Sequence, residues 1–490
     1  MKAPFSPYLA KLAPFFKRVI AKLGEHYDYV SLLSTDSKGL SCNISGRTKA
    51  VSTETPFTER GTVIRVHHKN LYVEYAFDAL NLEEALSEDE KTRDEAASML
   101  AGRVKTEVDW QLKMLERAHT EFYETPALPD EEREIFAEFD AEILPEEADV
   151  EKLLAIMTDV SERGKNALDE AVDCMVRATC THVNKLFLSA KQDLRQSYCY
   201  ADGSILLYVQ SEDNFNVAYQ SFSDRCGMEI YEHGYEKLLP ECIRIAKELL
   251  KADRVEPGEY TVITTPGISG LIAHEAFGHG VEMDMFVKNR ALGRDYINQR
   301  VGSDLVTMHE GALCADTCTG YAFDDEGTPA GDVIEIDHGI LKTGICDALS
   351  ALRLGVQPTG NGKRERFDHK VYTRMTNTVF DSGTDTLADM IASVDYGFLL
   401  DGTQSGMEDP KHWGIQCIVD RGYEIKDGKL TGRVISPVVM TGYVPDLLGS
   451  ISMVSTDREV DGAGMCGKGY KEWVKVADGG PYLKAKARLG

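Results

Sequence analysis

Two histidines and a glutamate form the part of this chain whose residue types are best suited to chemistry. They occur in the run Ala273-His274-Glu275-Ala276-Phe277-Gly278-His279-Gly280. Imidazole nitrogens bind Zn²⁺ and leave a coordination position open for water. A neighbouring carboxylate can accept the proton that this water loses when it attacks a carbonyl. The residue types therefore favour a hydrolytic zinc site with Glu275 as its base.

The spacing of the two histidines departs from the H-E-x-x-H pattern of many zinc enzymes. Residues i and i+4 of a regular helix lie about 40° apart around the axis, whereas i and i+5 lie about 140° apart. One π-helical turn would return His274 and His279 to the same side. Because glycine tolerates such a departure, we predict a locally bulged helix at Gly278. The plainer alternative is a chance pair of histidines on a partly buried helix, since residues 270–273 are apolar.

A zinc site with two histidines needs a third protein ligand, and three residues are candidates. Glu282 and Asp284 follow His279 closely, and Glu282 would complete a His, His, Glu site. Cys466 lies far along the chain in a glycine-rich segment, where a thiolate can approach a metal closely. A cysteine between glycines is also commonly a small buried side chain. The residues alone leave these alternatives open.

The composition restricts the class of protein and its partners. A chain of 490 residues can bury a large core and is expected to form two domains. Its net charge of −26 argues against nucleic acid and against an anionic membrane surface as partners. No run of 18 apolar residues occurs, so no membrane-spanning helix is predicted. The 11 scattered cysteines indicate reduced thiols and a cytoplasmic protein.

The first half of the chain predicts long helices alternating with strands. We expect an α+β protein, with an N-terminal α/β domain over residues 1–250 that contains an acidic helical segment. Between residues 121 and 150 there are 12 Asp or Glu and a single Arg, which predicts a solvated acidic loop or linker. Hairpins are expected between residues 61–66 and 71–75, and between 194–200 and 205–210 across Ala201-Asp202-Gly203. Helices are expected at residues 5–23, 82–115 and 234–250, and a long helix or a helix pair at residues 150–188.

The second half, residues 251–490, is rich in glycine and in short β-like runs. Strands are expected at residues 260–264, 333–336, 398–400, 414–419 and 431–440. Asp401-Gly402 and Asp427-Gly428 have the composition of turns between them. The pattern favours a β-rich domain that carries the helix of the zinc site.

Several ordered motifs resemble those of the TldD/PmbA metallopeptidases, in particular the zinc-bearing TldD type. Residues 273–284 are similar to the family's His-Glu-x-x-x-His motif, and the Cys466 segment is similar to its Gly-x-x-x-Cys-Gly-Lys segment. Further similar segments are residues 324–329, 339–342, 360–364 and 374–378. The resemblance covers residues 198–470 well and the N-terminal domain loosely.

The resemblance implies a zinc ion held by His274, His279 and Cys466, with Glu275 as the catalytic base. It implies that Glu282 and Asp284 lie around the ligands, where carboxylates orient imidazoles. It also implies a two-domain fold and a dimer with a PmbA-type (TldE) partner that lacks the zinc motif; a homodimer is the alternative. The family degrades small or unfolded peptides and trims leader peptides from modified precursors.

Two further interpretations concern the substrate and the reaction. Arg374 and Asn377 have side chains that can position a peptide backbone, although the residue types alone favour a role without substrate for both. Besides a zinc peptidase, the sequence allows a metal-binding subunit that is not catalytic and supports a partner protein. It also allows a cysteine hydrolase with Cys466 as nucleophile and a histidine as base.

Overall fold

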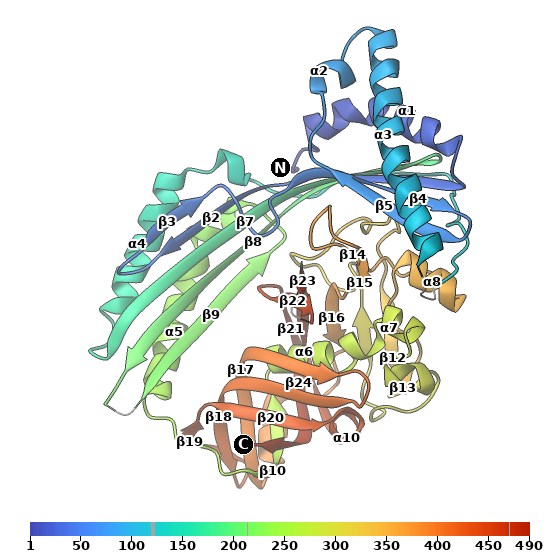
Figure 1. Cartoon of the computed structure of the whole chain (residues 1–490). Coiled ribbons are helices and arrows are strands. Elements are labelled where there is room, and N and C mark those ends of the chain that lie inside the picture. The colour runs from blue at the N-terminus through green and yellow to red at the C-terminus, as the bar shows by residue number, and fades with distance from the viewer. Residues whose placement is uncertain (119–122, 213, 470) are drawn as a thin grey trace.

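A long curved sheet from the N-terminal half of the chain covers a β-rich C-terminal half (Figure 1). The computed structural model describes residues 1–118, 123–212, 214–469 and 471–490. The expected α+β class is confirmed, since one nine-stranded and one eleven-stranded sheet are each packed with helices. Among the described residues, no helix is long and apolar enough to cross a membrane.

The N-terminal sheet is built around two paired strands of 19 residues each, β7 and β8. Six of its strands follow the order β3-β2-β7-β1-β4-β5. Strand β8 pairs with β7, and β6 and β9 each pair with β8. All pairs are antiparallel except that between β6 and β8. The strands are β1 (Tyr29–Asp36), β2 (Lys38–Ile44), β3 (Lys49–Ser52), β4 (Arg60–His68), β5 (Leu71–Phe77), β6 (Arg133–Glu138), β7 (Ala171–Ser189), β8 (Gln192–Gln210) and β9 (Phe215–Asp224).

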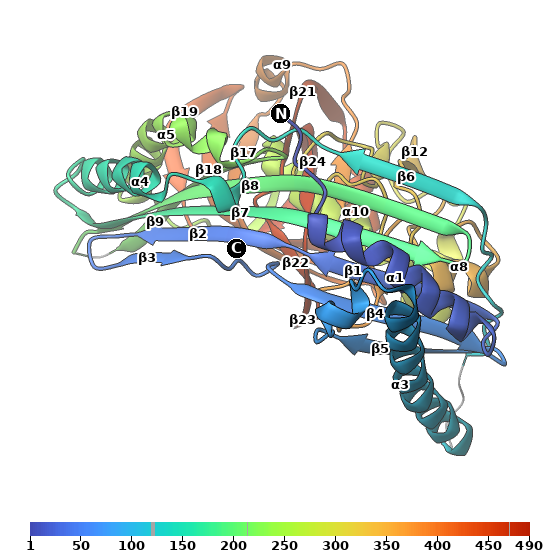
Figure 2. The same ribbon diagram turned by 90° about the horizontal axis from the view of Figure 1, so that it is seen from above.

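The helices of this half cover one face of the sheet, and the other face meets the C-terminal half. Successive side chains of a strand point to opposite faces. Cys174 and Leu186 of β7 accordingly pack in the clusters under the helices, whereas Phe187 packs against Phe323 of the C-terminal half. Seen from above, α1 lies across the sheet and α3 projects beyond it (Figure 2). The helices are α1 (Pro7–Gly24), α2 (Leu82–Ala85), α3 (Glu90–Arg117), α4 (Val150–Lys165) and α5 (Gly234–Leu249).

Three expectations for the N-terminal half are wrong. The helix expected at residues 150–188 ends at Lys165, and the rest is β7, whose residues alternate between the two faces. Ala201-Asp202-Gly203 is no turn, because β8 runs through it. Gly203 is needed there for space, since a Cβ would overlap the ring of Phe222. The acidic stretch expected to be a loop contains β6; its residues 121 and 122 lie outside the described residues.

Other expectations for this half are confirmed. The hairpin of β4 and β5 forms with Lys69 and Asn70 at its turn, both at positive φ as a two-residue hairpin requires. The helices α1 and α5 form as expected. The helical stretch from residue 82 is divided into α2 and α3, because Asp89 caps a new helix through the N–H of Thr92.

The C-terminal sheet is organised around its last strand, β24, which pairs with β10, β16, β20 and β21. The strands are β10 (Gly258–Thr264), β11 (Met308–Glu310), β12 (Val333–Asp337), β13 (Ile340–Leu341), β16 (Asn377–Phe380), β17 (Tyr396–Asp409), β18 (Gly414–Lys426), β19 (Lys429–Ile435), β20 (Val438–Tyr443), β21 (Met453–Asp461) and β24 (Ala477–Leu489). Two small hairpins stand apart, β14 (Gly362–Lys363) with β15 (Tyr372–Thr373) and β22 (Met465–Lys468) with β23 (Lys471–Lys475).

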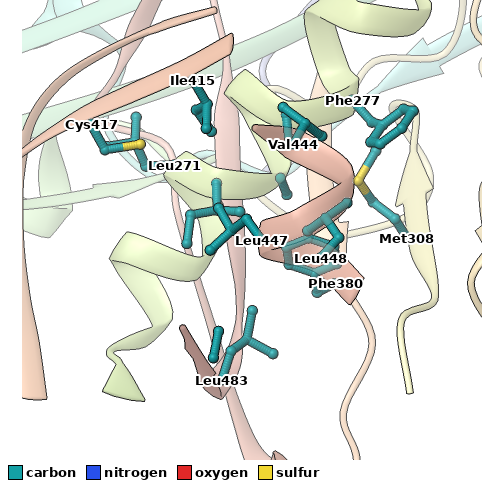
Figure 3. Close-up of a cluster of buried hydrophobic side chains, with 14 of the residues drawn as sticks. Leu271, Phe277, Met308, Phe380, Ile415, Cys417, Val444, Leu447, Leu448 and Leu483 are labelled. Carbon is teal, nitrogen blue, oxygen red and sulfur yellow. The ribbon is translucent and has the colours of Figure 1, made fainter. Parts of the chain in front are cut away.

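Most residues of helix α6 are buried in the core of this half. Figure 3 shows part of this core, in which Leu271 of α6 lies in one cluster with Phe277 of the following turn and Leu483 of β24. Gly270 lets α6 approach β24 closely, because a Cβ there would overlap the backbone of Gly479. The helices of this half are α6 (Pro266–Ala273), α7 (Met283–Val287), α8 (Ala348–Leu354), α9 (Leu387–Ala392) and α10 (Val444–Gly449).

One of the two turns expected in this half forms. Asp427 and Gly428 join β18 to β19 with φ of 48° and 74°. Asp401-Gly402 is not a turn but lies inside β17, at an irregularity where Gly402 (φ 78°) lies against Asp420. The strand expected over residues 431–440 is divided at Ser436-Pro437, since proline has no N–H to donate.

Buried ion pairs join the two halves. Glu326 pairs with Arg65 of β4, and the adjacent Asp325 pairs with Lys185 of β7. From the same region of the C-terminal half, Arg364 pairs with Glu74 of β5 at 2.6 Å. The acidic segment that contains Asp325 and Glu326 thus has a structural role, because charges buried at this depth need a partner of opposite sign.

We expect Glu326→Ala to lower the free energy of unfolding by about 3 kcal/mol, because the change leaves the buried guanidinium of Arg65 without one of its carboxylates. Urea denaturation measures the effect. Glu131→Ala is the matched control: this carboxylate is 74% exposed, so the loss should stay below about 1 kcal/mol. Equal losses in the two variants would contradict the role of the buried pair.

Candidate metal centre

The helix that carries both histidines contains the bulge that the sequence predicts. Past Ala273 the chain forms one π-helical turn from His274 to Gly278, in which the N–H of His279 donates to the carbonyl of His274. Gly278 has an ordinary helical φ of −56°. Glycine is needed at 278 for space, because a Cβ would overlap the Sδ atom of Met375. The predicted bulge is confirmed, and close packing against Met375 explains the glycine within it.

The bulge turns His274 and His279 towards a common point, where Cys466 meets them. The two rings are perpendicular, with centroids 5.1 Å apart. The Sγ atom of Cys466 lies 3.2 Å from Nε2 of His279, although 187 positions separate the two residues. One ligand atom from each of the three residues lies within 4.8 Å of the other two. The structure therefore brings the three expected ligands together.

Cys466 is held in place by a hairpin and by a buried arginine. It lies on β22 opposite Val474 of β23, so its segment is a hairpin strand rather than the glycine loop that the sequence suggests. The guanidinium of Arg374 donates to the carbonyl oxygen of Cys466 at 2.9 Å and to its Sγ atom at 3.0 Å. Arg374 is fully buried, and this contact orients the sulfur towards the histidines.

The charges of the three side chains suit a metal ion. Burial alone would raise the pKa of the Cys466 thiol, but His279 and His274 lower it well below its usual value. Burial alone would lower the pKa of His274, but Cys466 raises it to about 9. In the metal-free chain the raised pKa of His274 favours a protonated ring beside the thiolate. A zinc ion would take the place of such protons, and a thiolate with two neutral imidazoles is a donor set that fits Zn²⁺.

Carboxylates surround the ligands. Oε2 of Glu282 lies 3.3 Å from Nδ1 of His279, a distance at which a carboxylate can orient the ring. Lys468 binds Glu282 and Asp284 together, at 2.9 and 2.8 Å. Burial alone would raise the pKa of Glu282, but Lys468 and His279 hold it far below its usual value. Asp284 is hydrogen-bonded to Lys468 and Lys288 rather than to His274 or His279.

The sequence motifs did not identify two residues that lie beside the centre, Asp478 and Glu408. Oδ2 of Asp478 lies 3.9 Å from Nδ1 of His274, and burial raises the pKa of Asp478 to about 7. Glu408 of β17 has both carboxyl oxygens buried with no hydrogen-bond partner among the described residues, and burial raises its pKa to about 9. Neither stands in a recognisable motif, because only the pairing of strands brings them near the histidines.

Glu275 faces an open cleft together with the three ligands. The cleft has a volume of about 900 Å³ and lies between residues 403–408 of β17 and residues 464–469. Gly406 lies directly against Glu275, and a Cβ at 406 would come within 2.7 Å of its carboxyl carbon. Burial raises the pKa of Glu275, which the nearby His274 and His279 counteract. A carboxyl group held this firmly beside a metal centre can act as a base.

Arg374 and Asn377, expected near a substrate, both lie inside the protein. Asn377 accepts hydrogen bonds from Thr317 and Thr319 at 2.5 and 2.6 Å. Its amide nitrogen donates to the carbonyl of Gly311 at 2.8 Å. Arg374 and Asn377 are fully buried, and neither lines the cleft. Their polar side chains form hydrogen bonds with other parts of the chain.

Comparison with known proteins identifies similar chains. A family model described as the PmbA/TldA metallopeptidase C-terminal domain matches residues 257–487. A metalloprotease of Methanocaldococcus jannaschii is 29% identical over 353 residues, which cover 71% of this chain and 76% of that protein. A metalloprotease TldD homolog of Buchnera aphidicola is 35% identical over 245 residues, half of each chain. The crystal structure of TldE from Thermococcus kodakarensis has a TM-score of 0.72 at 16% identity, covering 97% of this chain and 100% of its own, which shows the fold.

The lowered pKa of Cys466 predicts how the metal-free chain reacts with iodoacetamide. A thiol whose pKa lies well below its usual value is already thiolate where an ordinary thiol, with a pKa of about 8.5, is still protonated, so its rate should change little as the pH rises towards about 8.5. Cys226 is the control, because burial raises its pKa and its rate should increase about tenfold per pH unit. Mass spectrometry of labelled peptides gives both rates. A tenfold increase at Cys466 would contradict the thiolate.

Proposed function

Because the chain belongs to the TldD/PmbA family of metallopeptidases, we propose that it is a zinc-dependent peptidase acting on small or unfolded peptides. The observation that carries the proposal is the approach of His274, His279 and Cys466 to one another beside Glu275. The open cleft next to them has a volume suited to a short stretch of peptide.

The chain's own residues would divide the work of hydrolysis between them. A zinc ion held by the two histidines and Cys466 would supply a Lewis acid for the scissile carbonyl and make water a better nucleophile. Glu275 would take the proton of the attacking water and transfer it to the leaving amine. Arg374 and Glu282 would keep the ligands in position through their contacts with Cys466 and His279.

The proposal extends to the substrate and to a partner subunit. Trimming of leader peptides from modified precursors is included, because such leaders are extended chains that an open cleft can admit. We further propose a dimer with a TldE-type chain, with a homodimer as the alternative. The similarity to a solved TldE and to a TldD homolog supports a pairing of two chains of one fold.

We expect Glu275→Gln to lower the rate of peptide cleavage by about 10²–10⁴-fold, because the amide cannot accept the proton. The bound zinc should remain at the wild-type level, since no ligand is changed. Cleavage of a peptide library and elemental analysis measure the two quantities, with the chain alone and together with a TldE-type partner.

Glu256→Gln is the matched control, because Glu256 is exposed and lies outside the cleft. Full cleavage by Glu275→Gln would overturn the assignment of the base. If the wild-type chain binds zinc and cleaves nothing with either partner arrangement, it is instead a metal-binding subunit that supports another protein.

A second candidate, a cysteine hydrolase, is favoured by two observations at Cys466. Cys466 Sγ lies 3.2 Å from His279 Nε2, and the pKa of the thiol is lowered, as in a nucleophile paired with a base. In such an enzyme the thiolate would attack the carbonyl carbon, and the imidazolium would protonate the leaving amine. The requirement for metal separates the two candidates.

Removal of zinc with a chelator is expected to abolish cleavage, and added Zn²⁺ should restore it. A metal ion bound by Cys466 would block its nucleophilic role, so a cysteine hydrolase would keep or gain activity in the chelator. Peptide cleavage is measured before the zinc is removed, after its removal by the chelator and after Zn²⁺ is added back. Activity that survives with less than a tenth of the original zinc would favour the cysteine hydrolase.

A further inference from the structure

A second group of metal-ligand residues lies close to the hairpin that carries Cys466. Besides the centre described above, one other group among the described residues brings three such ligand atoms within 4.8 Å: Glu365, His369 and Glu472. Glu365 and His369 lie between β14 and β15, and Glu472 lies on β23. Two segments about 100 positions apart therefore converge here.

Two of the three ligand separations within this group match those of a tetrahedral zinc site, and the third lies within 4.8 Å. Nδ1 of His369 lies 3.4 Å from Oε2 of Glu365 and 3.3 Å from Oε2 of Glu472. Zinc bonds of about 2.0–2.1 Å to nitrogen and oxygen place neighbouring ligand atoms about 3.3–3.4 Å apart in a tetrahedron. The corresponding separation between Cys466 and His279 is 3.2 Å. We propose that Glu365, His369 and Glu472 form a second zinc site, which fastens the β22–β23 hairpin.

The two carboxylates are already oriented for this role. Oε2 of Glu365 accepts the backbone N–H of Glu472 at 2.8 Å and keeps a lone pair for a metal. The side chain of Glu472 is 9% exposed, so its charge lies largely out of water. Two carboxylates and a neutral imidazole balance the charge of Zn²⁺. His369 is 36% exposed, which leaves a path for the ion and room for a water as fourth ligand.

The site is connected to Cys466 through Arg374. The carbonyl of Glu472 accepts a hydrogen bond from the guanidinium of Arg374, and this guanidinium also donates to Sγ of Cys466. A metal ion bound by Glu472 would therefore order β23, the strand whose Glu472 carbonyl accepts the hydrogen bond from Arg374. This coupling predicts that the second zinc tightens binding at the first.

The same segment is anchored to the N-terminal half. Arg364 pairs with Glu74, and the N–H of Phe367 donates to Oε2 of Glu59 at 2.8 Å. The ring of Phe367 lies against Gly61 of β4, where no side chain would fit. A zinc ion held by Glu365 and Glu472 would tie the hairpin to a segment that both halves of the molecule hold.

Titration of the chelated full-length chain with Co²⁺ tests the proposal without measuring peptide cleavage. The wild type is expected to bind two ions per chain, one of which gives the charge-transfer absorption of a thiolate ligand. His369→Gln should bind one ion and keep this absorption. Cys466→Ser should bind one ion and lose it. His412→Gln is the matched control, because His412 is 72% exposed and should leave both ions bound.

A wild-type chain that binds a single ion, or a His369→Gln chain that binds two, would overturn the proposal. Circular dichroism shows whether His369→Gln is folded; Glu365→Gln replaces it if it is not, and the same single ion is expected. His369→Gln should also weaken binding at the thiolate site by about fivefold or more. An unchanged affinity there would overturn the fastening role. Failure of the peptidase proposal leaves these results unaffected, since they depend only on metal content and absorption.

Discussion

The contact between the thiolate of Cys466 and the imidazole of His279 is the interaction on which the centre depends. It joins residues 187 positions apart and holds charged groups almost entirely out of water. Such groups are stable only when each is paired and hydrogen-bonded. Arg374 and Lys468 meet this requirement: Arg374 binds the sulfur, and Lys468 neutralises the carboxylate that orients His279.

Strand β24 gives the centre its geometry. Helix α6, which leads into the π-helical turn, packs on β24 at Gly270, where only a glycine allows the two backbones to approach. The hairpin that carries Cys466 leads into the same strand, and Asp478 of β24 faces His274. The same strand, β24, thus positions both the histidines and the thiolate. This arrangement can hold ligands to the tolerance that a metal site requires.

The N-terminal sheet supports the region around Cys466 from the other side. Lys185 and Arg65 of this sheet pair with Asp325 and Glu326, whose segment lies against Gly362 of β14. Glu365 and His369 follow β14 along the chain. The buried ion pairs between the halves therefore fix the loop from which the proposed second zinc site reaches the hairpin. Charge pairing here sets one orientation of the halves, since any shift would leave buried charges unpaired.

Much of the local structure could be predicted from the sequence, because its causes are local. Helical periodicity predicts α1 and α5, and turn composition predicts the turn at Asp427-Gly428. The offset of His274 and His279 predicts the bulged helix, because helical geometry alone decides which side chains share a face. The order of motifs predicts the family.

Other features were decided by the tertiary structure. Residues 171–189 and 192–210 form the strands β7 and β8 because each segment pairs with neighbouring strands over almost its whole length. This pairing outweighs the turn composition at Asp202-Gly203. Asp478 and Glu408 join the centre only through strand pairing, so no local pattern marks them. The sequence by itself determined which residues can bind a metal and act as a base, because these are properties of single side chains. Only the fold decided which of them meet, because a contact across 187 positions depends on the packing of the whole C-terminal half.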